Sequence, residues 1–201
     1  MTMRLRTRTG LAAAALAVLT VSPVHGADSQ GNYAVLGAGS FACERFIASA
    51  ESQSRQEINQ FMSWMQGYLT ALNRERDGIF SVSPFVSASD TAAMLLNVCR
   101  QQPELRLENA LRELADFLAG YRIEQASEVA QIASGDATVA VRASVLGDVR
   151  QRLAALGHDV GDGDALFDDQ LQQALREFQR EQGLTESGVP DADTLLRLFY
   201  Q

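Results

Sequence analysis

Histidine, cysteine and lysine, which supply many of the nucleophiles, general bases and metal ligands of enzymes, are scarce or absent in this chain. Its 201 residues include two cysteines and two histidines, and the 17 lysine and arginine residues are all arginine. A Schiff base needs a lysine amine, and serine or cysteine nucleophiles usually need a neighbouring histidine. We therefore predict no catalytic residues, no cofactor and no metal ion, and we expect that the protein is not an enzyme.

Carboxylates are the one reactive group in good supply, and Asp162, Asp164, Asp168 and Asp169 lie close together in the sequence. A pair of them could act as acid and base in the cleavage of a glycan. The cluster does not fit a calcium-binding EF-hand, because Leu166 stands where a ligand is needed. Aspartates in loops more often make turns or cap helices, so an enzyme using carboxylates ranks behind a binding or structural role.

Three short helices are predicted to position this acidic loop. The first begins near Val145 and stops at Gly157, a residue suited to ending a helix. The second follows the loop, and the third begins after Asp191, which is placed to cap it. The apolar stripes at helical spacing are Val145, Val149, Leu153 and Leu156, then Leu171, Ala174, Leu175 and Phe178, then Leu195, Leu198 and Phe199.

A longer series of residues in this part of the chain is similar to a known family. The series is Val149–His158, Asp164–Asp168, Ala174–Gln179, Gly183-Leu184, Gly188 and Asp191–Thr194. Over residues 145–199 it resembles the three-helix peptidoglycan-binding module often appended to cell-wall hydrolases. The resemblance implies binding of peptidoglycan, through its glycan or its stem peptide, at a shallow site. The ligand-binding residues that it implies are His158, Asp164, Phe167, Asp168 and Gln179.

The loop departs from the family pattern. Where the family usually has Asp-Gly-x-Phe-Gly-x-x-Thr, residues 164–171 read Asp-Ala-Leu-Phe-Asp-Asp-Gln-Leu. Arg150 also stands where the family commonly has glutamine. His158 occupies the usual aromatic position and is the better candidate for an exposed flat surface, whereas core packing is the favoured interpretation of Phe167.

Residues 1–26 are predicted to be a secretory signal peptide. Three arginines precede an apolar run, Leu11–Val21, that is too short to span a bilayer as a helix, and cleavage is expected near Gly26. The protein is therefore expected to be periplasmic. Cleavage removes three arginines and no acidic residue, which leaves 14 arginines against 25 acidic residues, a net charge of -11.

This acidic charge limits the expected partners. Nucleic acid needs a basic face, which the chain lacks, so nucleic-acid binding is not expected. Cationic groups of the wall peptide are favoured over the anionic polymers of the wall. No other apolar run reaches membrane-spanning length, so the mature chain is expected to contain no membrane span.

Residues 33–121 are predicted to form a helical domain held by a disulfide. Cys43 and Cys99 are an even pair in an exported chain, for which one disulfide is the simplest interpretation and two separate buried thiols are the alternative. A long central helix is expected over residues 54–76. Its Gly67 is expected to mark the close approach of another backbone.

Two further helices complete the prediction for this region. Ser89 is expected to cap the third helix, and Pro103 to lie in the first turn of a fourth that ends at Gly120. Trp64 and Tyr68 on the central helix are expected to be core residues.

Three stretches of this region, Gly39–Cys43, Trp64–Ala71 and Asn97–Pro103, are similar to a second family. Over about residues 39–118 they resemble the small, single-disulfide HdeA-type periplasmic proteins linked to acid stress. The resemblance implies a helical domain with weak client binding or dimerisation. Chaperone-like, inhibitor-type and immunity-type roles remain open alternatives.

The sequence thus predicts an all-α protein with a helical domain at residues 33–121 and a peptidoglycan-binding-like domain at 145–199. Residues 122–144 are predicted to be a flexible linker with a short helix near residues 127–132. The first hypothesis is a non-enzymatic periplasmic protein anchored to, or sensing, the cell wall. The alternative is an acid-stress chaperone-like or inhibitor-type protein whose carboxyl-terminal module is only structural.

Overall fold

The structure is a computed structural model that describes residues 27–52, 54–163 and 165–200. The chain divides into two compact units, Met1–Ala34 and Val35–Gln201. In the first unit, the Asp28 carboxylate accepts hydrogen bonds from the backbone amides of Gln30 and Asn32 and closes a turn. The predicted signal peptide, residues 1–26, lies outside the described residues.

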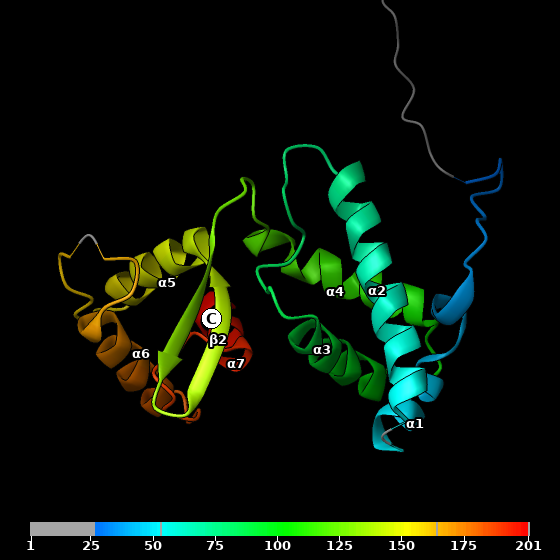
Figure 1. Cartoon of the computed structure of the whole chain (residues 1–201). Helices are drawn as coiled ribbons and strands as arrows, with labels where there is room; N and C mark the ends of the chain where they lie inside the picture. The colour runs from blue at the N-terminus through cyan, green and yellow to red at the C-terminus, as the bar shows by residue number, and fades with distance from the viewer. Residues whose placement is uncertain (1–26, 53, 164, 201) are drawn as a thin grey trace, which may run out of the picture. The chain divides into compact units, whose positions relative to one another are not determined.

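The described part of the second unit is mainly helical, with one small sheet (Figure 1). Among the described residues, no helix is both long and apolar enough to cross a membrane. The elements in order are η1 Gly37–Ser40, α1 Cys43–Glu51, α2 Arg55–Glu75, α3 Ala88–Gln101, α4 Leu107–Phe117, η2 Leu118–Tyr121, β1 Val129–Ser134, β2 Ala137–Arg142, α5 Ala143–Ala155, α6 Asp169–Glu181 and α7 Ala192–Phe199.

Residues 129–142 of the predicted flexible linker form a β-hairpin, so the short helix predicted near residues 127–132 is wrong and the all-α class is correct only in part. Strands β1 and β2 pair as an antiparallel hairpin, from Val129 opposite Arg142 to Ser134 opposite Ala137. The two-residue loop between them begins at Gly135, whose φ of +58° suits a hairpin turn. A Gly-Asp pair at this position is a hairpin signal that the sequence contained.

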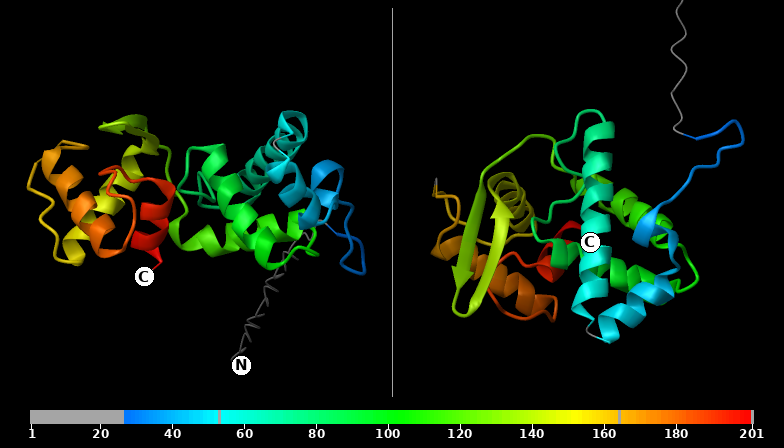
Figure 2. Two further views of the ribbon diagram at one scale, coloured as in Figure 1. Left: turned by 90° about the horizontal axis from the view of Figure 1, so that it is seen from below. Right: turned by 45° about the vertical axis from the view of Figure 1, so that its right-hand side comes forward.

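The sequence pattern of the hairpin is weak, because small residues make up part of its buried face. Alternate positions of each strand turn inward, and Ile132 and Val141 are 6% and 2% exposed. Both belong to the core formed by the last three helices, so the sheet packs into that core (Figure 2). The core residues that these three helices contribute are Val145, Leu146, Val149, Leu153, Leu171, Ala174, Leu175, Phe178, Leu195, Leu198 and Phe199.

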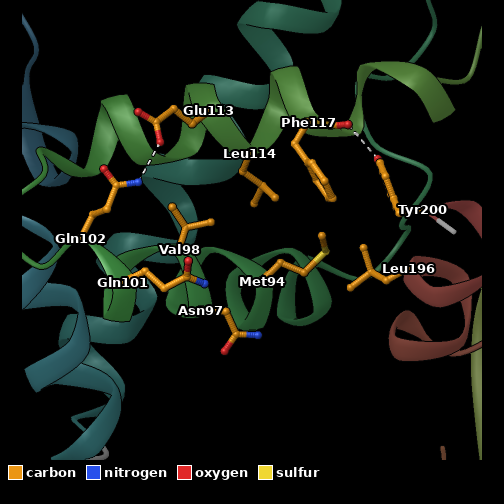
Figure 3. Close-up of a pocket in the computed structure, with 10 residues that line it drawn as sticks. All are labelled: Met94, Asn97, Val98, Gln101, Gln102, Glu113, Leu114, Phe117, Leu196 and Tyr200. Carbon is orange, nitrogen blue, oxygen red and sulfur yellow. Dashed lines mark hydrogen bonds between the residues drawn. The ribbon is translucent and has the colours of Figure 1, made fainter. Parts of the chain in front are cut away.

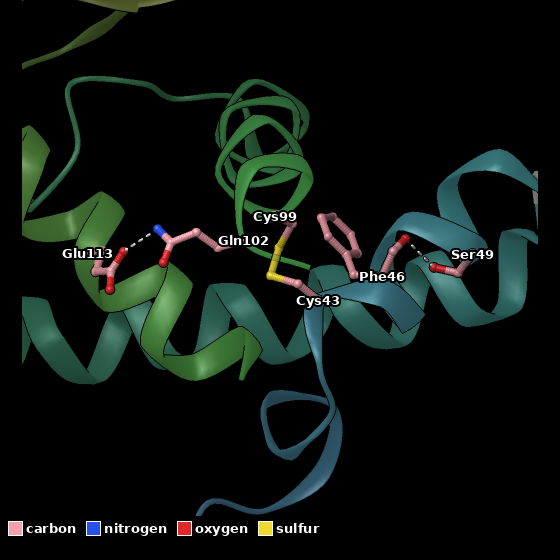
Figure 4. The surroundings of a disulfide bond; sticks show 6 residues. All are labelled: Cys43, Phe46, Ser49, Cys99, Gln102 and Glu113. Carbon is pink, nitrogen blue, oxygen red and sulfur yellow. Dashed lines mark hydrogen bonds between the residues drawn. A yellow bond between two sulfur atoms is a disulfide. The ribbon is translucent and has the colours of Figure 1, made fainter. Parts of the chain in front are cut away.

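The disulfide between Cys43 and Cys99 is confirmed, with an S–S distance of 2.06 Å (Figure 4). It ties the first residue of α1 to α3, and both cysteines are fully buried. The start of α1 is also held by two backbone hydrogen bonds, Cys43 N to Leu105 O at 2.8 Å and Glu44 N to Pro103 O at 3.0 Å. Pro103 therefore lies in the turn that precedes α4, and its predicted place inside the first turn of that helix is wrong.

The long central helix is confirmed as α2. Trp64 and Tyr68 are half-buried and pack against the amino-terminal core with their rings stacked at 5.3 Å. The indole of Trp64 donates a hydrogen bond of 2.7 Å to Leu36 O, and its ring lies directly on Gly39. The prediction for Gly67 is wrong, because this glycine is exposed and nothing would lie within 4 Å of an added Cβ.

Two helix ends differ from the sequence-based expectation. Ser87, not Ser89, caps α3, and its hydroxyl accepts a hydrogen bond of 3.3 Å from Asp90 N. Helix α4 ends at Phe117 and continues as the 3-10 turn η2, so Gly120 lies in that turn. Neither change alters which apolar faces are buried.

The three predicted helices of the carboxyl-terminal part are confirmed as α5, α6 and α7. Helix α5 ends in a Schellman motif, in which Gly157 N reaches Ala154 O and His158 N reaches Leu153 O, each at 3.0 Å. Gly157 has a φ of +92°, which favours glycine at this position. Asp191 caps α7 as expected, accepting a hydrogen bond of 2.9 Å from Thr194 N.

Two glycine substitutions should have opposite effects on stability. Gly67→Ala should raise the free energy of unfolding by about 0.5–1 kcal/mol, because alanine favours a helix and meets no neighbour there. Gly39→Ala should lower it by about 1–3 kcal/mol, because the new Cβ would overlap the Trp64 ring. Urea denaturation of both variants measures the difference, and equal shifts would contradict the packing of Trp64 on η1.

Candidate functional site

The loop between α5 and α6 is held against α5 by the guanidinium of Arg150. One terminal nitrogen donates to Val160 O, and the other donates to Ala165 O at 3.0 Å and to Asp168 Oδ2 at 2.9 Å. The Arg150 side chain is 20% exposed and that of Asp168 is 24% exposed. Arg150 thus gathers two loop carbonyls and one carboxylate around itself, and fixes both ends of the acidic segment.

Asp168 has two structural tasks in this arrangement. Its Oδ1 accepts a hydrogen bond of 2.8 Å from Leu171 N and so caps α6, while its Oδ2 pairs with Arg150. The hydrogen bond from Leu171, followed by that from Arg150, lowers the pKa of Asp168 below its ordinary value. The sequence-predicted ligand residue is therefore a carboxylate held ionised between a helix terminus and an arginine.

Two of the departures from the family pattern meet in this contact. Arg150 stands at the usual glutamine position and Asp168 at the second loop glycine, and the structure places them 2.9 Å apart. No local pattern linked these two residues, because 18 positions separate them along the chain. The sequence signal of their contact was that both depart from the family pattern. The loop therefore depends on an ion pair for part of its conformation.

His158 is much less exposed than expected. Its side chain is 9% exposed, and the ring meets the buried Phe178 edge-on with centroids 6.1 Å apart. Its nitrogens lie 4.0 Å from Glu177 Oε2 and 3.7 Å from Glu181 Oε2, on the outer side of α6. Only a small part of the ring reaches the surface, beside these two carboxylates.

Gln179 is fully buried, and its amide is occupied by protein atoms. Its oxygen accepts a hydrogen bond of 2.8 Å from Gly188 N, and its nitrogen donates to Val189 O and Thr194 Oγ1 at 3.0 and 2.8 Å. Ser187 Oγ lies 2.9 Å from the same nitrogen. The amide joins α6 to the segment before α7, which sequence reasoning did not find because the partners are set by the fold.

Phe167 and Asp164 are the two remaining predicted ligand residues. Phe167 is half-buried and packs against the core of the carboxyl-terminal part, in agreement with the favoured core interpretation. Asp164 lies outside the described residues. Of the five residues implied by the resemblance, Asp168, His158 and Phe167 are partly accessible in this loop region, and Gln179 is not.

The exposed surface of this loop is acidic. Asp159, Asp162 and Asp169 are exposed, and Glu177 and Glu181 continue the acidic surface onto α6. Carboxylates accept hydrogen bonds from hydroxyl and amide groups and attract ammonium groups. In the described part of the chain, no group of three or more histidine, cysteine and acidic residues is placed to hold a metal ion.

Two hollows border another side of α5. Their volumes are about 380 and 520 Å³, and both are lined by Gly120, Arg122 and Asp148. Burial raises the pKa of Asp148 above its ordinary value. None of the described ligand candidates lines either hollow, so these hollows are separate from the loop surface.

Comparison with known proteins gives one match. Residues 143–198 match the model of a family described as a putative peptidoglycan binding domain, and this segment spans α5, the acidic loop, α6 and most of α7. No curated protein and no solved structure matches the chain. The match supports a peptidoglycan-binding module in the carboxyl-terminal part of the protein.

The double role of Asp168 predicts two distinguishable effects of substitution. Asp168→Ala should lower the free energy of unfolding by about 1 kcal/mol or more, because both the cap and the ion pair are lost. Asp168→Asn should cost less, since asparagine still caps. Thermal unfolding of both variants near neutral pH measures these costs, with the exposed Asp162→Asn as control.

The cost of Asp168→Asn should also depend on pH. The folded-state pKa of Asp168 is lowered, so its charge stabilises the fold fully above the ordinary value of 3.8 and loses this effect as the pH falls through the lowered pKa. The difference between wild type and Asp168→Asn should therefore vanish on acidification. A difference that persisted at the lowest pH would contradict the ion-pair role.

Proposed function

We propose that this protein is a non-enzymatic periplasmic protein that binds peptidoglycan through residues 143–198. The observation that carries the proposal is the family match over the segment that folds as α5, the acidic loop, α6 and α7. The proposed role is to anchor the helical part, residues 33–121, to the cell wall or to sense the wall. Export of the chain rests on the composition of residues 1–26.

The loop surface suggests which groups of peptidoglycan are recognised. The Arg150 guanidinium is hydrogen-bonded to atoms of the loop. The exposed charges beside it are therefore the carboxylates of Asp159, Asp162 and Asp169. Such a surface repels anionic wall polymers and attracts free amino groups of stem peptides. Hydrogen bonds from sugar hydroxyls and peptide amides to the same carboxylates add to this attraction.

Sedimentation with insoluble sacculi tests the proposal. Residues 27–201 should sediment with the sacculi, and less so at high salt, because exposed charges are screened. Replacing Asp159, Asp162 and Asp169 with asparagine should reduce the bound fraction several-fold. Acetylating the free amines of the sacculi should have the same effect on the wild-type protein.

A matched variant controls for net charge in this experiment. Replacing Glu51, Asp77 and Glu104 with the corresponding amides removes the same charge from exposed positions outside the matched segment. This control should bind like the wild type. Absence of sedimentation of the wild-type protein would overturn peptidoglycan binding, and equal losses in both variants would overturn the loop as the binding surface.

We propose as a second candidate an acid-stress role for the helical part, as its HdeA-type resemblance implies. One observation favours it: burial of Asp90 on α3, and then the charges of Asp191 and Asp193 at the start of α7, raise the pKa of Asp90. A carboxyl group with a raised folded-state pKa takes up a proton as the pH falls through that value. Acidification then relieves an unfavourable interaction and favours the folded form.

Light scattering by an acid-labile enzyme at low pH tests this second role. The full chain should reduce the scattering, and a variant with Cys43→Ser and Cys99→Ser should do so much less, because α1 is no longer tied to α3. Unchanged scattering in the presence of the wild-type protein would remove the acid-stress role and leave the wall-binding proposal intact.

A further inference from the structure

An apolar groove with one acidic end lies between α3 and α4, away from the acidic loop (Figure 3). Its volume is about 440 Å³, which is within the range of small-molecule sites. The sides of the groove are made by Met94 and Val98 of α3 and Leu114 of α4. Most of the surface that a ligand would contact is therefore hydrocarbon.

The other end of the groove is closed by side chains from α4 and from the end of the chain. The rings of Phe117 and Tyr200 stack with centroids 4.0 Å apart and planes 13° apart, and Leu196 lies beside them. The Tyr200 hydroxyl donates a hydrogen bond of 2.9 Å to Phe117 O, and Tyr121 meets the Tyr200 ring edge-on at 4.7 Å. These contacts fix the aromatic wall, so the groove is formed before any ligand binds.

The acidic end has features that favour a positive charge. Glu113 is the one acidic or basic side chain among the residues that line the groove. Burial, and then Tyr121, raise the pKa of the Tyr200 phenol, so this ring adds no charge to the groove. The Gln102 side chain donates to one Glu113 oxygen at 3.2 Å. Helix α3 ends at Gln101 beside this carboxylate, and the carboxyl end of a helix carries partial negative charge.

We propose that this groove binds a cationic amphiphile, with its apolar chain between α3 and α4 and its ammonium group at Glu113. The apolar sides can contact an alkyl chain, and the single carboxylate beside the end of α3 can pair with a cationic head group. The exposed ring face of Phe117, which is 52% exposed, extends the apolar surface at the far end. The site is separate from the acidic loop, because no residue of that loop lines it.

Calorimetric titration of residues 27–201 tests the proposal. The titrants are alkylammonium ions of increasing chain length, each below its micelle concentration, and alkyl sulfates of the same lengths. Affinity for the ammonium series should rise by up to about fourfold per methylene, as burial of a CH₂ group predicts. The sulfates should bind at least about tenfold more weakly, because Glu113 repels them.

Two variants separate the apolar and the charged contribution. Glu113→Gln should abolish the preference for ammonium and keep the chain-length dependence, whereas the exposed Glu104→Gln should change neither. Val98→Arg should weaken ammonium binding at least about tenfold, because the new side chain fills the groove and its positive charge repels the ammonium group. Thermal unfolding checks that this variant remains folded. Lack of binding at any chain length overturns the site, and equal affinity for ammonium and sulfate overturns the cationic ligand.

Discussion

The contacts of Arg150 with the loop between α5 and α6 hold in place the segment that carries the exposed carboxylates of the carboxyl-terminal part. Arg150 forms an ion pair with Asp168 in which both side chains are mostly buried. Arg150 does more than pair, because it also satisfies the carbonyls of Val160 and Ala165, which would otherwise need water or another donor. With these acceptors occupied, the loop offers a ligand mainly the carboxylates that point outward.

Gln179 illustrates the same constraint inside the core. A buried amide needs partners for its oxygen and its nitrogen, and here they lie in the segment before α7 and in the first turn of α7. The residue therefore stabilises a turn of the module and has no group left for a sugar or peptide. A polar residue of a family motif can thus act by fixing the positions of helices and turns and not by contacting a ligand.

The described part of the chain presents two surfaces of opposite character. The acidic loop consists of exposed carboxylates on a fixed backbone and suits polar, cationic groups in weak, salt-dependent contacts. The groove between α3 and α4 has apolar sides, an aromatic wall tied by Tyr200 and a single carboxylate. The surface proposed for peptidoglycan and the groove proposed for an amphiphile are therefore lined by different residues.

The sequence by itself determined the long helix α2, the disulfide and the three capped helices α5 to α7. These features depend on local signals, such as apolar spacing, an even cysteine count and capping residues at helix ends. Their physical causes act within a few residues of each other, or through one covalent bond. The hairpin also had a local signal, at Gly135, but its small inward residues disguised the alternation.

Only the tertiary structure decided which polar groups remain free for a ligand. Whether His158 is exposed depends on how α6 packs over it, and whether Asp168 is free depends on where Arg150 points. The groove between α3 and α4 needs Tyr200, which lies 83 residues after its hydrogen-bond partner Phe117. Burial and partner choice are properties of packing between distant segments, and for that reason residue types and spacing did not reveal them.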